Sequence, residues 1–229
     1  MNRMRILAVD TTTSSGSVAI LEGTNLLAEI AVESASTHSS RLLRSINLLL
    51  ENAPLGIADV KGFAVAPGPG SFTGIRIGLS TIKAFAFASG KPVAPVSSLR
   101  ALAWKLRDSG ARLVCPMLDA KKGEIYAALF ETSGGRMREA IRQGAYSPDQ
   151  FLMLLPARKS ILFIGDGAHL YRDKILNRLK DRAAYSSRSS FIAYEIGRLG
   201  YELLKKKKGV DSAGLQPLYF RRSQAEDKH

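Results

Sequence analysis

Two stretches of this sequence have the residue types needed to hold a phosphate group. The first is GPGSFTG, residues 68–74, with glycines spaced GxGxxxG, whereas dinucleotide-binding loops read GxGxxG and P-loops end in GK[ST]. Backbone amides at the start of the next helix, capped by Ser71 or Thr73, can bind an anion. Two interpretations stay open: a tight turn for packing, or an anion or nucleotide contact through Gly68, Gly70 and Ser71.

The second stretch follows an apolar strand that ends in Asp10. Residues 11–15 are all threonine or serine, and Gly16 closes the turn. A strand-end aspartate followed by hydroxyl groups can hold a hydrated metal ion or a phosphate. Asp10, Thr11 and Thr12 are therefore candidate nucleotide or anion contacts, although a plain hydrogen-bonded turn explains them equally well.

The sequence argues against a transition-metal site. Its three histidines, His38, His169 and His229, show no HxxxH or HExxH spacing, and the single cysteine, Cys115, excludes the CxxC patterns of zinc sites. No serine lies in a GxSxG elbow. We therefore predict no metal ligands, and we expect Cys115 to be a buried apolar residue.

The composition is that of a globular protein with a basic second half. Of 229 residues, 45% are apolar and 23% are charged, as is ordinary for globular domains. No apolar run is long enough for a signal peptide or a membrane span, so we expect a cytoplasmic protein with no membrane contact. Residues 1–100 hold nine Lys and Arg against six Asp and Glu, and residues 101–229 hold 24 against 14. This excess indicates a nucleic-acid partner or a solvated surface.

Hydrophobic periodicity predicts the elements that position these stretches. In the first half we expect strands at 5–10, 17–22, 26–32, 62–66 and 91–96, and helices at 37–53, 73–88 and 98–107, the first capped by Ser36 or Thr37. In the second half we expect strands within 113–131 and at 137–141 and 161–164, and helices at 147–155, 168–179 and 191–207.

The two halves follow one plan. Residues 113–131 repeat the pattern of residues 6–22, in which an apolar strand ends in an aspartate, Asp10 or Asp119, and a glycine-containing turn leads to a second apolar strand. Chance similarity of two hairpins is the alternative. A duplication predicts two mixed-sheet α/β subdomains at 1–104 and 105–222, with the helix at 191–207 packing back on the first and a frayed tail at 223–229.

The helix at 73–88 carries two apolar stripes. Ile75, Leu79 and Ile82 share one face, while Ile77 and Ala84 lie on roughly the opposite face. A helix this apolar must be covered on more than one side. One cover can be the chain's own sheet and the other a second protein.

Several segments closely resemble the bacterial TsaB (YeaZ) family. They are ILAVDTTTSSGSVAI, STHSSRLLRSINLLLENA and DVKGFAVAPGPGSFTGIRIGLSTIKAFAFASGKPVAPVSSLRALA in the first 105 residues, with LDAKKGEIYAALF and QPLYFRR later in the chain. The resemblance implies an actin-like (ASKHA, ribonuclease H-like) fold of two subdomains, each a mixed sheet flanked by helices, in agreement with the duplication.

The resemblance also implies a role in tRNA modification. TsaB-like proteins support the catalytic relative TsaD, together with the ATPase TsaE, in placing a threonylcarbamoyl group on the adenosine next to the anticodon of tRNAs that read codons beginning with A. The catalytic relatives carry a metal-binding HLEAH motif where this sequence reads SLRAL, which puts Ser98 and Leu102 at the histidine positions. The implied role is therefore that of a non-catalytic subunit.

The same resemblance implies partners and their contacts. It predicts a heterodimer with TsaD, a ternary complex with TsaE, a homodimer when the chain is alone, and tRNA contact through the complex. No cofactor is expected to bind tightly, although ATP can act at the level of the complex. The contacts are expected on the helices at 37–53 and 73–88, and the predicted interface residues are Leu42, Leu43, Ile46, Leu49, Ile75, Leu79 and Ile82.

Two other functions remain open from the sequence alone. The first is an ATP-binding kinase- or hydrolase-like enzyme of the same fold, for which the Asp10 turn and the glycine loop would hold the nucleotide. The second is a direct tRNA-binding module, suggested by the basic second half.

Overall fold

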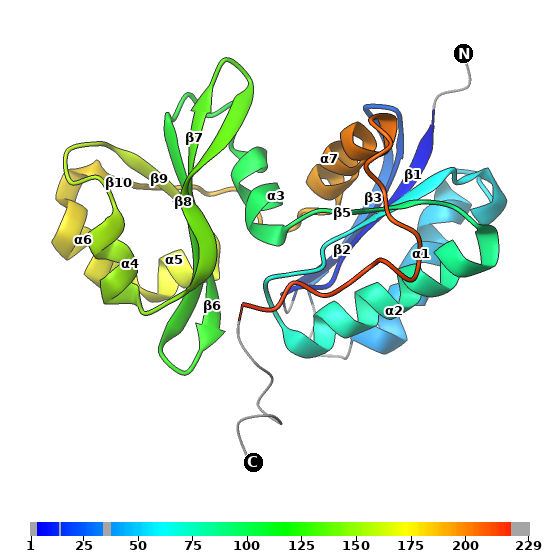
Figure 1. The fold of residues 1–229 in the computed structure, drawn as a ribbon, viewed down its shortest axis with the longest axis horizontal. Coiled ribbons are helices and arrows are strands. Elements are labelled where there is room, and N and C mark those ends of the chain that lie inside the picture. Colours follow the sequence, from blue (N-terminus) through cyan, green and yellow to red (C-terminus); the bar gives the residue numbers. More distant parts are fainter. Residues whose placement is uncertain (1–3, 14, 34–37, 221–229) are drawn as a thin grey trace. The chain divides into compact units, whose positions relative to one another are not determined.

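The computed structural model describes residues 4–13, 15–33 and 38–220. The chain divides into two compact units (Figure 1). Unit 1 contains Met1–Ala101 and Phe191–Tyr219, and unit 2 contains Leu102–Ser190 and Phe220–His229. The expected caps Ser36 and Thr37 and the expected tail at 223–229 lie outside the described residues.

Unit 1 is built on a five-stranded mixed sheet. Its strand order is β3-β2-β1-β4-β5, where β1 is Arg5–Asp10, β2 is Ser15–Glu22, β3 is Asn25–Glu33, β4 is Gly62–Val65 and β5 is Val93–Pro95. β1 pairs antiparallel with β2 and parallel with β4. Because β1 and β4 are buried along nearly their whole length, they read as continuous apolar runs rather than as an alternating pattern.

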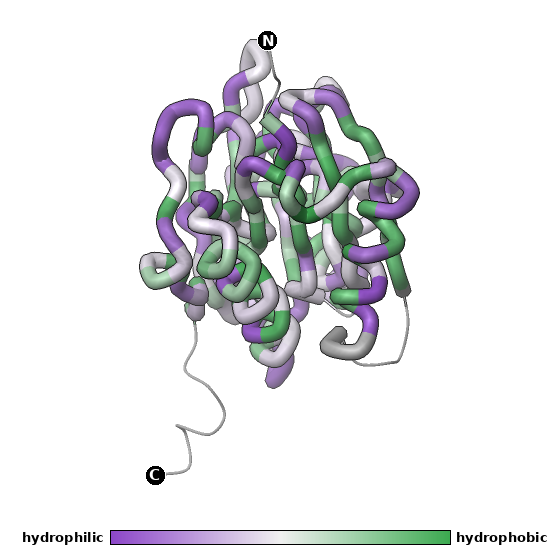
Figure 2. Tube along the Cα trace, turned by 90° about the vertical axis from the view of Figure 1, so that its right-hand side faces the viewer, coloured by the Kyte–Doolittle hydropathy of each residue, from purple (hydrophilic) through white to green (hydrophobic). Residues whose placement is uncertain are grey.

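Helices cover both faces of this sheet. α1 (His38–Asn52) and α2 (Phe72–Ser89) pack on one face, with the short helix η1 (Ile57–Asp59) after α1. α7 (Ala193–Lys205) packs across the other face, against β1, β2, β4 and β5 (Figure 1). Figure 2 colours the trace by residue hydropathy and shows apolar and hydrophilic stretches alternating along it.

Unit 2 has a sheet of the same topology. Its order is β10-β9-β6-β7-β8, where β6 is Leu113–Lys121, β7 is Glu124–Ser133, β8 is Arg136–Tyr146, β9 is Ile161–Ile164 and β10 is Ala183–Tyr185. α4 (Pro148–Leu154), α5 (Asp166–Leu170), α6 (Arg172–Leu179) and η2 (Lys180–Arg182) belong to this unit, while α3 (Ser98–Lys105) spans the boundary between the units. β6 to β10 thus repeat the places of β1 to β5, and the predicted duplication of two mixed sheets is confirmed.

The structure differs from the sequence-based expectation in three places. The helix expected at 168–179 is two helices, because Tyr171 at the junction has φ −104° and ψ 24°, which is outside helical geometry. β10, only three residues long, was not predicted. The first unit ends at Ala101 rather than at 104, and the segment that returns to it is Phe191–Tyr219, longer than the helix at 191–207 that was expected to pack back on the first subdomain. No helix in the described ranges is long and apolar enough to cross a membrane.

Candidate functional site

Asp10 lies at the end of β1 in a fully buried position. Its Oδ1 accepts hydrogen bonds from the Thr12 backbone N–H at 3.0 Å and from the Thr12 hydroxyl at 2.7 Å. Its Oδ2 has no hydrogen-bond partner within the part of the chain that the structure describes. Burial raises the pKa of Asp10 from 3.8 to about 6; the hydrogen bonds from Thr12 lower it, and the charge of Glu195 raises it further. Asp10 is therefore a carboxyl group that gains its proton about two pH units higher than an ordinary aspartate.

The glycine loop packs directly on the turn after Asp10. The Thr12 carbonyl accepts a hydrogen bond from the Ser71 N–H at 2.6 Å, and the Thr11 hydroxyl donates to the Gly74 carbonyl at 2.7 Å. A Cβ atom on Gly74 would lie 1.9 Å from the Thr11 carbonyl oxygen, and one on Gly70 would lie 2.1 Å from the Thr12 carbonyl oxygen. The two stretches thus pack so closely that Gly70 and Gly74 have no room for a side chain.

The structure shows where the six predicted nucleotide or anion contacts lie. Asp10, Thr11, Thr12, Gly70 and Ser71 come together, but as partners of one another. Gly68 instead lies against the backbone of residue 218, since a Cβ there would meet the Leu218 carbonyl oxygen at 2.6 Å. Ser71 caps α2, accepting from the Gly74 N–H at 3.3 Å. These contacts support the packing interpretation of the loop over the phosphate interpretation.

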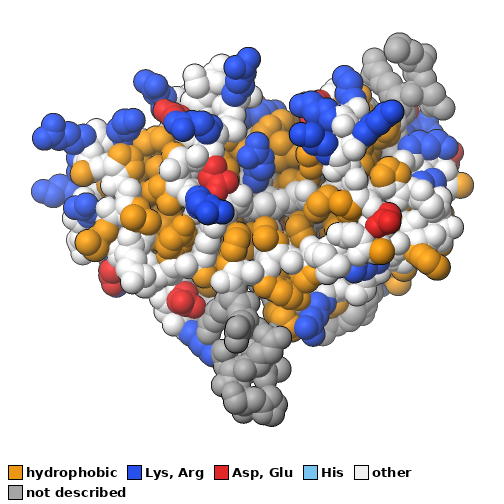
Figure 3. Space-filling view, viewed as in Figure 1, with side chains coloured by type: hydrophobic (Ala, Val, Ile, Leu, Met, Phe, Trp, Pro, Cys, Tyr) orange, Lys and Arg blue, Asp and Glu red, His pale blue; other side chains and the backbone are white. Residues whose placement is uncertain are grey.

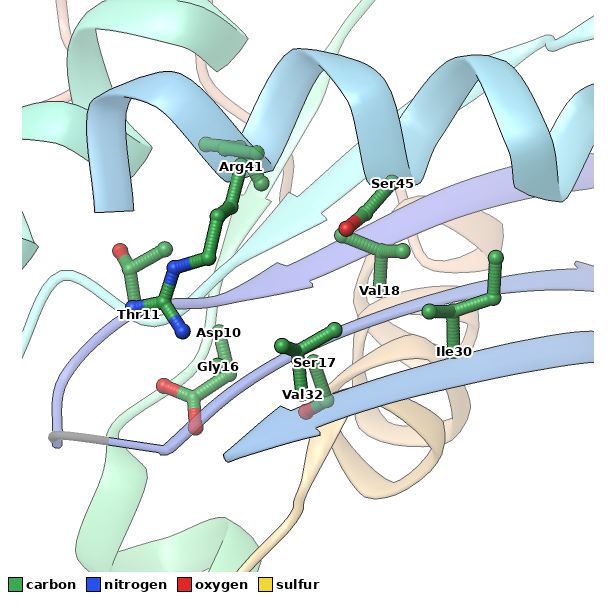
Figure 4. Close-up of a pocket in the computed structure, with 10 residues that line it drawn as sticks. Asp10, Thr11, Gly16, Ser17, Val18, Ile30, Val32, Arg41 and Ser45 are labelled. Carbon is green, nitrogen blue, oxygen red and sulfur yellow. The ribbon is translucent and has the colours of Figure 1, made fainter. Parts of the chain in front are cut away.

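A small cavity opens beside Asp10 between α1 and the sheet (Figure 4). Its polar lining comes from Asp10, Thr11, Ser17, Arg41 and Ser45, and the Arg41 side chain extends from α1 toward the end where Asp10 and Thr11 lie. The cavity volume is ≈ 20 Å³, slightly above the ~10–15 Å³ that one water molecule needs. It can hold a water molecule but not a nucleotide.

The corresponding aspartate of unit 2 has a different environment. The Asp119 side chain is 14% exposed, and its Oδ2 lies 2.6 Å from the Lys121 Nζ. Its Oδ1 accepts from the Lys121 N–H at 2.8 Å, and its own N–H donates to Asp166 Oδ1 at 3.1 Å. The hydrogen bond to Asp119 raises the pKa of Lys121. The second copy of the hairpin therefore holds an ordinary ion pair.

Ser98 and Leu102 stand where the resemblance places the histidines of TsaD-like proteins. Ser98 and Leu102 are both buried in α3, and the Ser98 hydroxyl donates to the Pro69 carbonyl at 2.6 Å. The His169 side chain is exposed, and that of His38 is not described. Residues 4–13, 15–33 and 38–220 contain no group of three or more His, Cys, Asp or Glu able to hold a metal ion.

The predicted interface residues need correction, because most of them are core residues. Six of the seven have side chains in the core between the helices and the first sheet, each at most 5% exposed: Leu42, Ile46, Leu49, Ile75, Leu79 and Ile82. Only Leu43 points outward, at 57% exposed. Each helix turns its more continuous apolar stripe toward its own sheet, so a partner can reach only the opposite faces.

Those opposite faces are themselves partly apolar. On α1, Leu43 and Leu48 are 57% and 47% exposed, and on α2, Phe87 is 82% exposed. Ala84 and Ala88 are also exposed on α2. α1 and α2 pack against each other, so these side chains belong to one helical layer. We call this outward side of α1 and α2 the helical face.

Sequence reasoning missed two residues of the Asp10 site. Glu195 of α7 is 4% exposed and raises the pKa of Asp10, although 185 positions separate the two in sequence. Its signal was a glutamate among the apolar residues of the last predicted helix, beside Ile196 and Gly197, which are also buried. Arg41 gave no signal, because it lies off the apolar stripe of α1.

Comparisons with known proteins agree with the resemblance. A family model described as "TsaD: tRNA N6-adenosine threonylcarbamoyltransferase" matches residues 27–222. The tRNA threonylcarbamoyladenosine biosynthesis protein TsaB of Bacillus subtilis is 31% identical over 98% of this chain and 97% of its own length. The structure of YeaZ from Pseudomonas aeruginosa has a TM-score of 0.82 at 28% identity and covers 94% of this chain and 99% of its own.

A more distant structure supports the fold alone. The ROK hexokinase of Thermus thermophilus has a TM-score of 0.51 at 12% identity and covers 89% of this chain and 100% of its own. The predicted actin-like architecture is thereby confirmed. Together with the full-length relative, these findings establish that the chain belongs to the TsaB (YeaZ) family of tRNA threonylcarbamoyladenosine biosynthesis proteins.

Proposed function

We propose that this chain is the non-catalytic subunit of the complex that places a threonylcarbamoyl group on the adenosine next to the anticodon of tRNAs reading codons that begin with A. In that role it forms a heterodimer with TsaD in the cytoplasm, supports TsaD activity, and joins TsaE in a ternary complex. Membership in the TsaB family is the observation that carries this proposal.

The site chemistry supports a non-catalytic role. In place of the two metal-binding histidines of TsaD-like proteins, the chain has Ser98, whose hydroxyl is bonded to a carbonyl, and Leu102, a core residue without a donor atom. The space where a phosphate would approach the glycine loop is filled by the Thr11 and Thr12 carbonyls. A subunit built this way binds no nucleotide tightly, so ATP acts elsewhere in the complex.

The helical face is the surface we assign to TsaD. Leu43, Leu48 and Phe87 are exposed large apolar side chains on two helices that pack together, and exposed apolar patches mark protein-protein contacts. The same face would close a homodimer when the chain is alone. Aromatic and aliphatic anchors such as these dominate binding free energy in interfaces.

A pull-down with TsaD, followed by reconstitution of tRNA modification, tests the proposal. We expect Leu43→Glu and Phe87→Glu each to weaken TsaD binding by about tenfold or more, since a charge would be desolvated at the contact. Met153→Glu is the matched control, because Met153 is an apolar side chain 74% exposed on α4 of unit 2. Equal binding by all three variants would refute the assignment of the helical face. Failure of the unmodified chain to bind TsaD would refute the function.

A nucleotide-hydrolysis assay addresses the alternative enzyme. We expect the isolated chain not to turn over ATP at millimolar concentration. Turnover without TsaD, abolished by Asp10→Asn, would favour the kinase- or hydrolase-like reading instead.

A further inference from the structure

The end of α7 carries more positive charge than a helix terminus needs. Cations in the last turn stabilise the helix dipole, and this effect fades within that turn. α7 ends at Lys205, so Lys206, Lys207 and Lys208 lie beyond it, and all four lysines are exposed. Lys207 has φ 54°, a left-handed conformation that glycine or asparagine adopts more readily than lysine. Helix capping therefore does not account for this run.

Tertiary contacts bring two further lysines to the same place. Val210 exchanges both backbone hydrogen bonds with Val93, each at 2.8 Å, which ties the chain just after the lysine run to β5. The Leu204 side chain lies against Gly62, and Gly209 lies beside Pro92. Lys61 and Lys91 directly precede Gly62 and Pro92 in the chain, so their backbones lie close to the run. We call these six residues the lysine surface: Lys61, Lys91 and lysines 205–208.

Local carboxylates do not neutralise this surface. Three carboxylates lie within a few positions of these lysines in the chain: Asp59, Glu202 and Asp211. Asp59 Oδ2 accepts a hydrogen bond from the Gly56 N–H at 2.8 Å, and Asp211 Oδ1 accepts one from the Gly214 N–H at 2.7 Å. Within the described ranges, lysines 61 and 205–208 form no salt bridge.

Figure 3 shows Lys and Arg side chains gathered over the end of α7. Lys91 is held in place by the carbonyls of Ile57 and Ala58, which its Nζ reaches at 3.3 and 3.1 Å. The other five lysines are exposed, and a group of exposed ammonium groups without salt bridges favours a polyanionic partner.

We propose that the lysine surface docks the phosphodiester backbone of RNA. Exposed ammonium groups at a helix end neutralise phosphates and read no bases, so the contact would position RNA without regard to its sequence. The choice of RNA over other polyanions rests on the proposed function, because that function makes tRNA the substrate. Lysines 205–208 lie in the basic second half of the sequence, from which a tRNA contact was expected, and the fold of unit 1 adds Lys61 and Lys91 from the first half.

Salt-dependent binding of a fluorescently labelled tRNA transcript to the isolated full-length chain tests this inference. Between about 50 and 200 mM salt, four to five phosphate contacts give a log–log slope of roughly −4. We expect Lys206→Glu/Lys208→Glu to weaken binding by about tenfold or more at low salt and to make the slope shallower by about two. The matched control is Lys122→Glu/Lys159→Glu, which changes the net charge equally at two exposed lysines of unit 2.

The outcomes separate this inference from the proposed function. Equal weakening by both double variants, or no RNA binding at the lowest salt, would overturn the lysine surface as an RNA site. Binding of anionic phospholipid vesicles without binding of RNA would also overturn it and assign the surface to a membrane. If TsaD binding and tRNA modification remain intact in such a case, the proposed function stands. If TsaD binding fails while the two double variants still differ in RNA binding, only the proposed function falls.

Discussion

The first hairpins of the two sheets have the same topology, but their aspartates have different electrostatic environments. β1 and β6 occupy the same place in sheets of the same strand order; β1 ends in Asp10, and β6 carries Asp119 two residues before its end at Lys121. Asp10 is fully buried with a pKa of about 6, whereas Asp119 is partly exposed and paired with Lys121 at 2.6 Å. The two hairpins therefore share a backbone plan and differ in the environment of their aspartate.

Three differences around the hairpins account for the different environments of Asp10 and Asp119. The second turn is shorter and passes through Lys121, Lys122 and Gly123, all at positive φ, which brings the Lys121 ammonium back to the Asp119 carboxylate. The first turn is longer and is covered by the glycine loop. α7 then adds the buried Glu195 from the far end of the chain. The aspartate environment is therefore set by what packs on the hairpin.

The largest expected effect on stability tests a feature that both units share, a glycine packed against a backbone carbonyl. Gly74→Ala would place a Cβ 1.9 Å from the Thr11 carbonyl oxygen, and Gly165→Ala would place one 2.2 Å from the Met117 carbonyl oxygen. Because backbone must move in both cases, we expect each to lower the free energy of unfolding by about 3 kcal/mol, measured by urea denaturation. Gly56→Ala is the control, with its nearest atom at 3.6 Å, and should change stability by less than about 0.5 kcal/mol. A mild Gly74→Ala effect beside a severe Gly165→Ala effect would show that the first loop can separate from the Asp10 turn.

The next largest effect on stability tests the feature that differs, the buried carboxyl group of Asp10. The folded-state pKa of Asp10 is raised from 3.8 to about 6, so the folded state binds more protons than the unfolded state between these values. The stability contributed by Asp10 is present below about pH 4 and is lost as pH rises through about 6. Asp10→Asn keeps an acceptor for Thr12 and removes the buried charge. We expect it to raise the free energy of unfolding by roughly 2 kcal/mol above pH 7 and to flatten the pH dependence from 4 to 6. An unchanged pH profile would show that Asp10 is not the group responsible.

The smallest effect comes from the other copy. Lys121→Ala removes the pair with Asp119, but the Lys121 side chain is 76% exposed, and exposed ion pairs contribute less than about 1 kcal/mol. We expect a loss within that range, diminished further in high salt, when thermal unfolding is compared at two ionic strengths. A loss as large as that of the glycine variants would mean that the second hairpin also depends on its aspartate.

Local sequence signals predicted much of the architecture. The strand at 161–164 was predicted with its observed ends, and Ser147, the first residue of the helix expected at 147–155, caps α4 by accepting from the Gln150 N–H. Short or interrupted elements were harder, because β10 has only three residues and the break at Tyr171 carries no proline or glycine. Periodicity also identified two apolar stripes on α2 but not which one faces the sheet, since both have similar residue types.

The sequence by itself determined the duplicated α/β plan, the family and the absence of a histidine pair at Ser98 and Leu102, because strand patterns and motif residues are local properties of the chain. Only the tertiary structure decided that the glycine loop packs on the turn after Asp10, that Leu79 and its stripe belong to the core, and that Lys61 and Lys91 lie near lysines 205–208. Burial, close backbone approach and the gathering of charge depend on residues distant in sequence, which no local pattern records.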